Sequence, residues 1–198
     1  MEIENNVIPA KQFVEGVAYL LRETFAGSPE GQPSAYLDRG VGIFATLGDI
    51  SADAASMEFH GTTIAGQTEH AKFYLDRLCE FINGRTETVN WDASWLIEDV
   101  NDAEWDALRE SVRRSYESTL RCLADVPDWS GERVGMAMGM VAHTAYHLGA
   151  IRQIAKSRNS GKVVRETATK EMVSMGASYF PRSRGPYFQG LRSLFSSE

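Results

Sequence analysis

The chain has 198 residues, a length typical of one domain with a sizeable core. Hydrophobic residues make up 43% of it and charged residues 24%, close to the globular average, which excludes a disordered or fibrous chain. Its apolar runs are far shorter than the roughly 18–20 residues that cross a bilayer, and Met1-Glu2-Ile3-Glu4 is acidic where a signal peptide is basic. We therefore expect a soluble, cytoplasmic protein without a membrane partner.

The net charge of −7 is unevenly distributed along the chain. From Lys156 to the end there are eight basic and three acidic residues, so this segment carries +5 and residues 1–155 carry −12. An acidic body repels phosphate, which disfavours nucleic acid as a partner of the main domain. The basic tail is expected to contact the acidic body or a second subunit instead.

The first predicted helix begins after Pro9, a residue suited to a first helical turn, and ends near Gly27-Ser28-Pro29. Its apolar residues recur at a spacing of three to four, which predicts a one-sided stripe: Phe13, Val17, Leu20 and Leu21. Residues 28–61 mix Gly, Pro and Ser with short apolar groups. We expect them to form a long, partly structured connection with a brief helix after Ser51.

Two further helices carry clear start and stop signals. Thr62 or Thr63 can cap the second helix, and Asn83-Gly84 closes it where a left-handed residue is favoured. The third helix opens with Asn101 and Glu104, spaced as a capping box, and stops at Asp125-Val126-Pro127.

The fourth predicted helix, from about Val134 to Lys156, has no Pro and is apolar on nearly every face, which predicts burial on most sides. No strand-like alternation and no internal repeat is visible. The sequence therefore predicts an all-α four-helix bundle over residues 1–157, with a long connection between its first two helices. Residues 158–198 form a basic, aromatic extension that we expect to pack on the bundle or on a partner subunit.

Three of the four histidines lie in these helices, His70 on the second and His143 and His147 on the fourth. At about 100° per residue, His143 and His147 project together toward the apolar seam, and His70 can reach the core from the flank of its helix. Neutral imidazole is a preferred ligand of zinc and nickel, and three nitrogens leave a coordination position open for water or a thiol. The pattern predicts a divalent-metal site at His70, His143 and His147.

Two other interpretations stand beside this one. The ion can be purely structural, tying two helices together in a non-catalytic bundle or one that binds a small molecule. Alternatively, the histidines are metal-free core residues with satisfied hydrogen bonds. The sequence contains no GxSxG motif, P-loop or dinucleotide-binding glycine fingerprint, so nothing indicates a serine nucleophile or a nucleotide cofactor.

The string His143-Thr-Ala-Tyr-His147-Leu-Gly149-Ala-Ile151, with Thr63-Ile-Ala-Gly-Gln-Thr-Glu-His70, resembles the DinB/YfiT-like superfamily over about residues 9–157. The resemblance implies a DinB-like four-helix bundle in which His70, His143 and His147 bind a divalent metal, usually zinc or nickel. Ala150 stands where family members often have Gln, which leaves any role of that amide in doubt.

Relatives in this superfamily include S-transferases that use bacillithiol, mycothiol or another low-molecular-weight thiol, and a mycothiol-dependent maleylpyruvate isomerase. The resemblance therefore implies a metal-dependent thiol S-transferase, or a related enzyme, with a low-molecular-weight thiol as cofactor and a small-molecule substrate. It also implies a homodimer.

Other residue types that often carry chemistry are expected to be structural here. Gly61-Thr62-Thr63 separates His60 from His70, so His60 is expected in a surface loop. Cys79 and Cys122 are too far apart in sequence for a CxxC motif and are expected to be reduced thiols buried at positions where a small hydrophobic residue would serve.

The sequence leaves two possible roles, one functional and one structural, for Tyr74, for Gln67 and for the tryptophans. Tyr74, one turn after His70, either lines a substrate cavity or packs in the core. Gln67, one turn before it, either orients a ligand or is an ordinary surface glutamine. Most of the four tryptophans should cover an end of the bundle, although one can roof a pocket.

Overall fold

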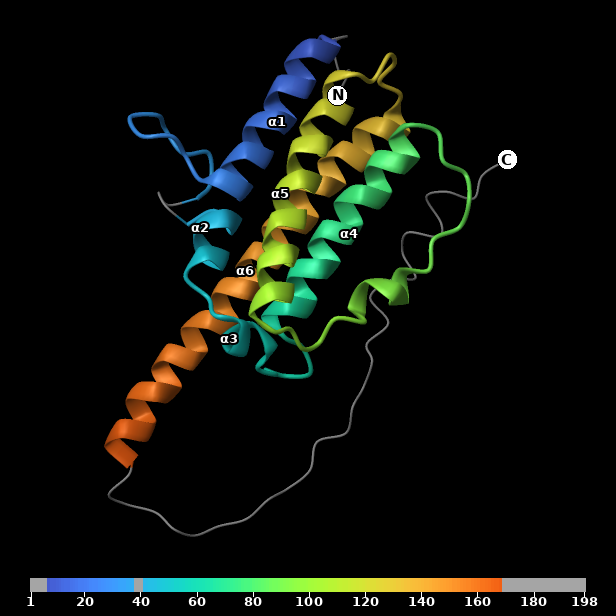
Figure 1. Ribbon diagram of the computed structural model, residues 1–198. Coiled ribbons are helices and arrows are strands. Elements are labelled where there is room, and N and C mark those ends of the chain that lie inside the picture. Colours follow the sequence, from blue (N-terminus) through green and yellow to red (C-terminus); the bar gives the residue numbers. More distant parts are fainter. Residues whose placement is uncertain (1–6, 38–40, 169–198) are drawn as a thin grey trace, which may run out of the picture.

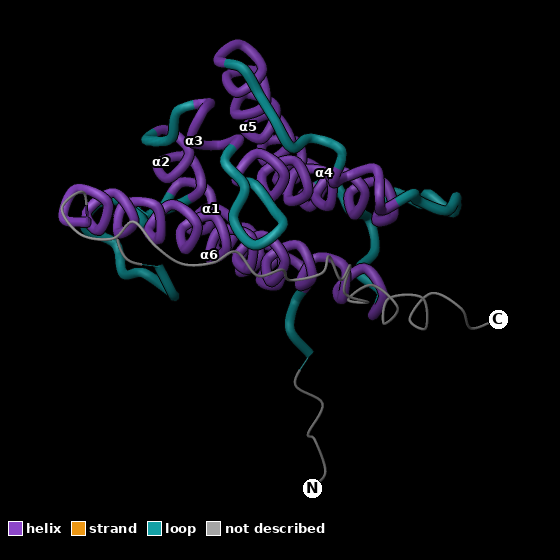
Figure 2. Tube along the Cα trace, turned by 90° about the horizontal axis from the view of Figure 1, so that it is seen from below, coloured by secondary structure: helices purple, strands orange, loops and turns teal. Residues whose placement is uncertain are grey.

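The computed structural model describes residues 7–37 and 41–168. Within these ranges the chain is helical, and the only β-type pairing there is an isolated bridge between Phe59 and Thr62 (Figure 2). The elements are, in chain order, α1 (Ala10–Ala26), α2 (Ile43–Gly48), α3 (Ala52–Ser56), α4 (Ile64–Ile82), a 3₁₀ helix η1 (Trp91–Trp95), α5 (Asp102–Ala124) and α6 (Gly131–Ala168). The prediction of an all-α fold is confirmed for the residues that the structure describes.

The four long helices pack around one hydrophobic core. α4 contacts both α5 and α6, and α1 contacts the same two helices from the other side. In Figure 1, α1, α5 and α4 lie side by side with α6 behind them. The largest fully buried hydrophobic side chains come from all four helices and from α2: Leu21, Phe25, Leu47, Ile64, Leu75, Ile82, Trp105, Leu123, Met140, Leu148 and Ile151.

The predicted caps position the ends of the helices. The Thr63 hydroxyl accepts the backbone N–H of Gly66 at 2.9 Å and begins α4. At α5, the Asn101 side chain accepts the N–H of Glu104 at 3.0 Å, and the Glu104 carboxylate accepts the N–H of Asn101 at 2.9 Å. This reciprocal pair is a capping box, as the sequence predicts.

The connection between α1 and α4 contains two short helices. α3 follows Ser51 as expected, whereas α2 was not predicted, because six residues are too few to show a helical period. α2 packs against α1 and α5. Gly42, its N-cap, lies so close to the end of α1 that an added Cβ would be 2.5 Å from the Gly27 nitrogen.

Hydrogen bonds to the buried carboxylate of Glu23, on α1, hold the start of the connection between α1 and α4 in place. Glu23 is only 2% exposed. Its carboxylate accepts the backbone N–H groups of Ala35 at 2.7 Å, Tyr36 at 2.9 Å and Leu37 at 2.6 Å, and also the Ser34 hydroxyl. Burial alone raises the pKa of Glu23, but these hydrogen bonds outweigh burial and lower it to about 2.

The expectation that α6 is buried on most sides is wrong. α6 packs on α1 and α4, and its outward face leaves Met138 and Tyr146 exposed. An apolar composition cannot show how many neighbours a helix has, which is why the sequence misled here. α6 also continues to Ala168, past the predicted end near Lys156, so residues 158–168 of the predicted extension are helical. Residues 169–198 lie outside the described residues, and the packing of the extension is therefore not described.

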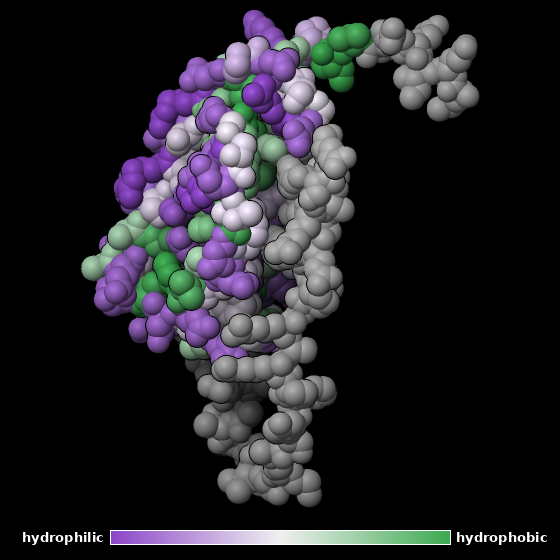
Figure 3. All heavy atoms as spheres, turned by 90° about the vertical axis from the view of Figure 1, so that its right-hand side faces the viewer, coloured by the Kyte–Doolittle hydropathy of each residue, from purple (hydrophilic) through white to green (hydrophobic). Residues whose placement is uncertain are grey.

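The surface agrees with a chain that buries its apolar residues inside one core. Figure 3 shows the side of α4 and of the connection that follows it, where hydrophilic residues dominate and hydrophobic residues form small separate patches. Among the described residues, no helix combines the length and the hydropathy that a membrane span requires.

Candidate metal centre

Three histidine side chains converge where α4 packs on α6. His70 comes from α4, and His143 and His147 come from successive turns of α6. One nitrogen of each ring lies within 4.8 Å of the others. The ring centroids are 5.0 Å apart for His70 and His143, 4.8 Å for His70 and His147, and 4.3 Å for His143 and His147. The structure thus brings together all three residues that the sequence singles out.

Burial keeps these rings neutral. His70 is 1% exposed and His147 is 2% exposed, while His143 is half-buried. Loss of hydration lowers the pKa of His70 to about 4. Burial, followed by repulsion from the neighbouring imidazoles, lowers the pKa of His143 to about 3 and that of His147 to about 2. At neutral pH each ring therefore carries a lone pair, which metal binding requires.

A serine of η1 fixes the tautomer of His70. The Ser94 hydroxyl donates its proton to the Trp91 carbonyl at 2.6 Å. Its oxygen lies 2.6 Å from His70 Nδ1 and must therefore accept a hydrogen bond from that nitrogen. With the proton on Nδ1, the lone pair of His70 is on Nε2.

The side chain of Gln67 fixes the tautomer of His147. The Gln67 amide donates through Nε2 to the Thr62 hydroxyl at 3.0 Å. Its oxygen therefore accepts from His147 Nδ1 at 2.6 Å, and the lone pair of His147 is on Nε2. Partners of this kind, which hold the far nitrogen of a ligand, are the usual second layer of a metal–histidine site.

The remaining nitrogens fit a bound cation. His143 Nε2 and His147 Nε2 are buried and have no hydrogen-bond partner among the described residues. Buried polar atoms without a partner are rare in folded proteins, and each calls for a specific explanation. A cation held by the cluster would satisfy both atoms, so the residues present fit a metal ion.

Aromatic rings enclose the three histidines. Tyr74 is buried and stacks on His143 with a centroid distance of 3.6 Å. Trp95 of η1, which is 37% exposed, stacks on His70 at 4.0 Å. Tyr146, which is 69% exposed, meets the ring of His147 edge-on at 5.0 Å. The solvent boundary of the site therefore lies at Trp95 and Tyr146, whereas Tyr74 closes its inner side.

The neighbours of the histidines were only partly foreseen from the sequence. Gln67 is buried against His147 and is not an ordinary surface glutamine. Ser94 and Trp95 were not predicted to touch His70, because they lie in a connection without periodicity and reach the site only through tertiary packing. His60 is exposed in a turn, with a φ of 49°, and stays outside the cluster as predicted.

No family model, no curated protein and no solved structure matches the chain.

Proposed function

We propose that this chain is a DinB-like four-helix-bundle metalloprotein in which His70, His143 and His147 bind one divalent ion. We further propose that the ion activates a low-molecular-weight thiol, or water, for an S-transferase type of reaction on a small-molecule substrate. The observation that carries the proposal is the buried, neutral cluster of three imidazoles, two of them held by Ser94 and Gln67 in the tautomer that a ligand needs.

The donor set favours zinc or nickel. All three candidate ligands are imidazole nitrogens, and among the described residues no carboxylate or thiolate belongs to the cluster. Magnesium and calcium prefer oxygen ligands, whereas imidazole suits zinc and nickel. Because the cluster offers three protein ligands rather than four, it has the composition of a reactive site more than of a closed structural one.

The side chains around the cluster have separable tasks. A divalent ion in this position would act as a Lewis acid and lower the pKa of a thiol or of water toward neutrality. Ser94 and Gln67 orient the rings of His70 and His147 through their Nδ1 protons. Tyr74 excludes water from the core side by stacking on His143. Trp95 and Tyr146 stand where a small substrate would enter, since both face solvent.

The choice of a thiol as cofactor rests on the resemblance of residues 9–157 to the DinB/YfiT-like superfamily. The homodimer, the small-molecule substrate and the absence of a nucleic-acid partner are part of the same proposal. The alternative is a non-catalytic helical protein in which the ion only ties α4 to α6 or in which the bundle binds a small molecule.

Metal content tests the ligands directly. Elemental analysis of the purified protein should find one equivalent of zinc or nickel, and His70→Ala and His147→Ala should each lose it. The matched control is His60→Asn, which removes an imidazole outside the cluster and suits the positive φ of that turn. Full metal content in both cluster variants would refute the ligand assignment and favour metal-free core histidines.

Ligand exchange tests the catalytic half of the proposal. Cobalt-loaded protein is titrated with 2-mercaptoethanol and with glutathione, and visible absorption is recorded. A thiol that reaches the ion should change the spectrum. An unchanged spectrum with either thiol, in protein that binds cobalt fully, would reject the S-transferase reaction and leave the structural alternative.

A further inference from the structure

The two cysteines of the chain, 43 positions apart, meet across the interface between α4 and α5. The Cys122 thiol donates a hydrogen bond to the Cys79 carbonyl oxygen, with 3.8 Å between the sulfur and the oxygen. The Cys79 thiol also lies 3.4 Å from the Thr119 hydroxyl, one turn before Cys122 on α5. Both cysteines are free and half-buried.

This pair is separate from the histidine cluster. Cys79 follows His70 by nine residues on α4. At about 100° and about 1.5 Å per residue, that places Cys79 on the opposite face of the helix and roughly 13 Å along its axis. The histidines face α6, whereas Cys79 faces α5, so the thiols do not complete the metal site.

The two thiols differ chemically. The hydrogen bond from Cys79 lowers the pKa of Cys122, and the Asn83 amide, 3.5 Å from the Cys122 sulfur, adds to this against the opposing effect of burial. The same thiol–thiol bond and burial raise the pKa of Cys79. The thiolate is the nucleophile in thiol–disulfide exchange, so this difference in pKa favours Cys122 as the attacking residue and Cys79 as the resolving one.

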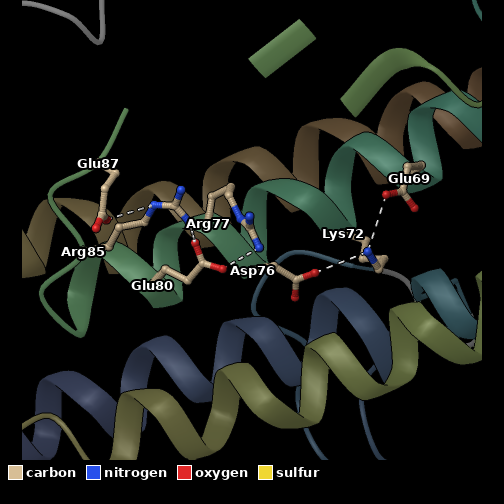
Figure 4. A network of polar contacts seen from close by, with 7 residues as sticks. All are labelled: Glu69, Lys72, Asp76, Arg77, Glu80, Arg85 and Glu87. Carbon is tan, nitrogen blue, oxygen red and sulfur yellow. Dashed lines mark hydrogen bonds and ion pairs between the residues drawn. The ribbon is translucent and has the colours of Figure 1, made fainter. Parts of the chain in front are cut away.

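A surface cavity lies beside the pair: Cys79 lines it directly, and Asn83, which also lines it, contacts the Cys122 sulfur through its amide. Its volume is about 670 Å³, and its lining includes Cys79, Asn83 and Ser118 of α5. Two arginines of the rim, Arg77 and Arg85, both pair with Glu80 (Figure 4). The rim also holds Asp76, so its two acidic side chains balance its two arginines. The cavity therefore does not favour a ligand of either charge.

We propose that Cys79 and Cys122 are a reversible dithiol–disulfide pair that links α4 to α5, with a low-molecular-weight disulfide as the oxidant. The Cys122 thiolate attacks one sulfur of the oxidant, whose S–S bond breaks, and the first thiol leaves with a proton from solvent. Cys79 then loses its proton and attacks the Cys122 sulfur of the mixed disulfide, releasing the second thiol. Two protein thiols are oxidised, and one small disulfide is reduced to two thiols.

The experiment uses the full-length protein in buffers of reduced and oxidised glutathione. After quenching with iodoacetamide, intact mass and peptide mapping locate each sulfur. In oxidising buffer the protein should lose the mass of two hydrogen atoms, resist alkylation at both cysteines and yield a peptide that joins Cys79 to Cys122. Dithiothreitol should reverse this.

Single variants separate the roles of the two thiols. Cys79→Ser should stop at the mixed disulfide and carry one glutathionyl group on Cys122. Cys122→Ser should react about tenfold more slowly than Cys79→Ser, because its remaining thiol lacks the stabilised thiolate. Neutral hydroxyethyl disulfide should give the same internal bond in the wild type, since the charges of the cavity rim balance.

Three results would overturn the proposal: thiols of the wild type that stay open to alkylation in oxidising buffer, a disulfide that joins two chains, or a glutathionyl group that remains on Cys79. The His70→Ala variant should form the internal disulfide as the wild type does. Failure of the metal proposal would thus leave this test unaffected.

Discussion

The substitution Glu23→Gln should lower the free energy of unfolding by an amount that depends on pH. The Glu23 carboxylate receives three backbone N–H groups and the Ser34 hydroxyl in the connection after α1. In Glu23→Gln, the amide oxygen can still accept from Tyr36 and Leu37. The amide NH₂ then faces the backbone N–H of Ala35. Two hydrogen-bond donors are thus placed against each other in a buried position, and neither finds an acceptor there.

The magnitude follows from proton linkage. The pKa of Glu23 falls from 4.5 to about 2 in the folded protein. At about 1.4 kcal/mol per pKa unit, the carboxylate contributes about 3 kcal/mol to the free energy of unfolding. Because the folded pKa is the lower one, this contribution is complete above pH 4.5 and disappears as the pH falls toward 2. Glu23→Gln should therefore cost about 3 kcal/mol at pH 7, and the difference from the wild type should shrink between pH 5 and pH 3.

Urea denaturation followed by circular dichroism at pH 7, 5 and 3 measures this difference, and comparison at each pH cancels the titration of the buried histidines. Glu15→Gln is the matched control, because Glu15 lies on the same helix with an exposed side chain and a weak surface pair to Lys11. It should change stability by less than about 0.5 kcal/mol. Equal effects of the two variants at pH 7, or a gap that stays constant down to pH 3, would refute the reasoning.

Three further predictions concern the metal centre and the packing of α1. Ser94→Ala should weaken zinc or nickel binding about 10- to 100-fold in a competition titration, because it releases His70 Nδ1; unchanged affinity would contradict this. Chelation should lower the melting temperature of the wild type and not that of His70→Ala, since an ion at 100 times its dissociation constant stabilises by about 2.7 kcal/mol; an equal shift in both would count against the centre. Gly16→Ala should stabilise the protein by up to about 1 kcal/mol, because Gly16 is open to solvent within α1. Gly42→Ala should destabilise it by about 1–3 kcal/mol, because the added Cβ would overlap the end of α1. Thermal melts in which both variants shift the melting temperature in the same direction would reject this account.

The long helices could be predicted because their signals are local. Caps at Thr63 and Asn101 and the stop at Asn83-Gly84 act within one turn of the residues that carry them. α2 lacks such signals, since it is held by packing on α1 and by Gly42. The exposed outer face of α6 was missed for the same reason, because the number of neighbours of a helix is a tertiary property.

The candidate site divides in a similar way. The spacing of His143 and His147 determines that they share a face, and the position of His70 on α4 allows it to meet them. The contact of Ser94 with His70 depends on how the connection after α4 folds back, and no period in the sequence encodes that path. The meeting of Cys79 and Cys122 likewise depends on the register between two helices, which periodicity within each helix does not specify.

The division of the three imidazoles between α4 and α6 determines when an ion can be captured. His70 and His147 are far apart along the chain, and they converge only after the two helices have packed and η1 has closed over them. A nascent chain leaving the ribosome therefore offers no assembled chelate. An ion bound by the three imidazoles would therefore have to reach the assembled site beside the indole of Trp95 and would not be captured by the unfolded chain.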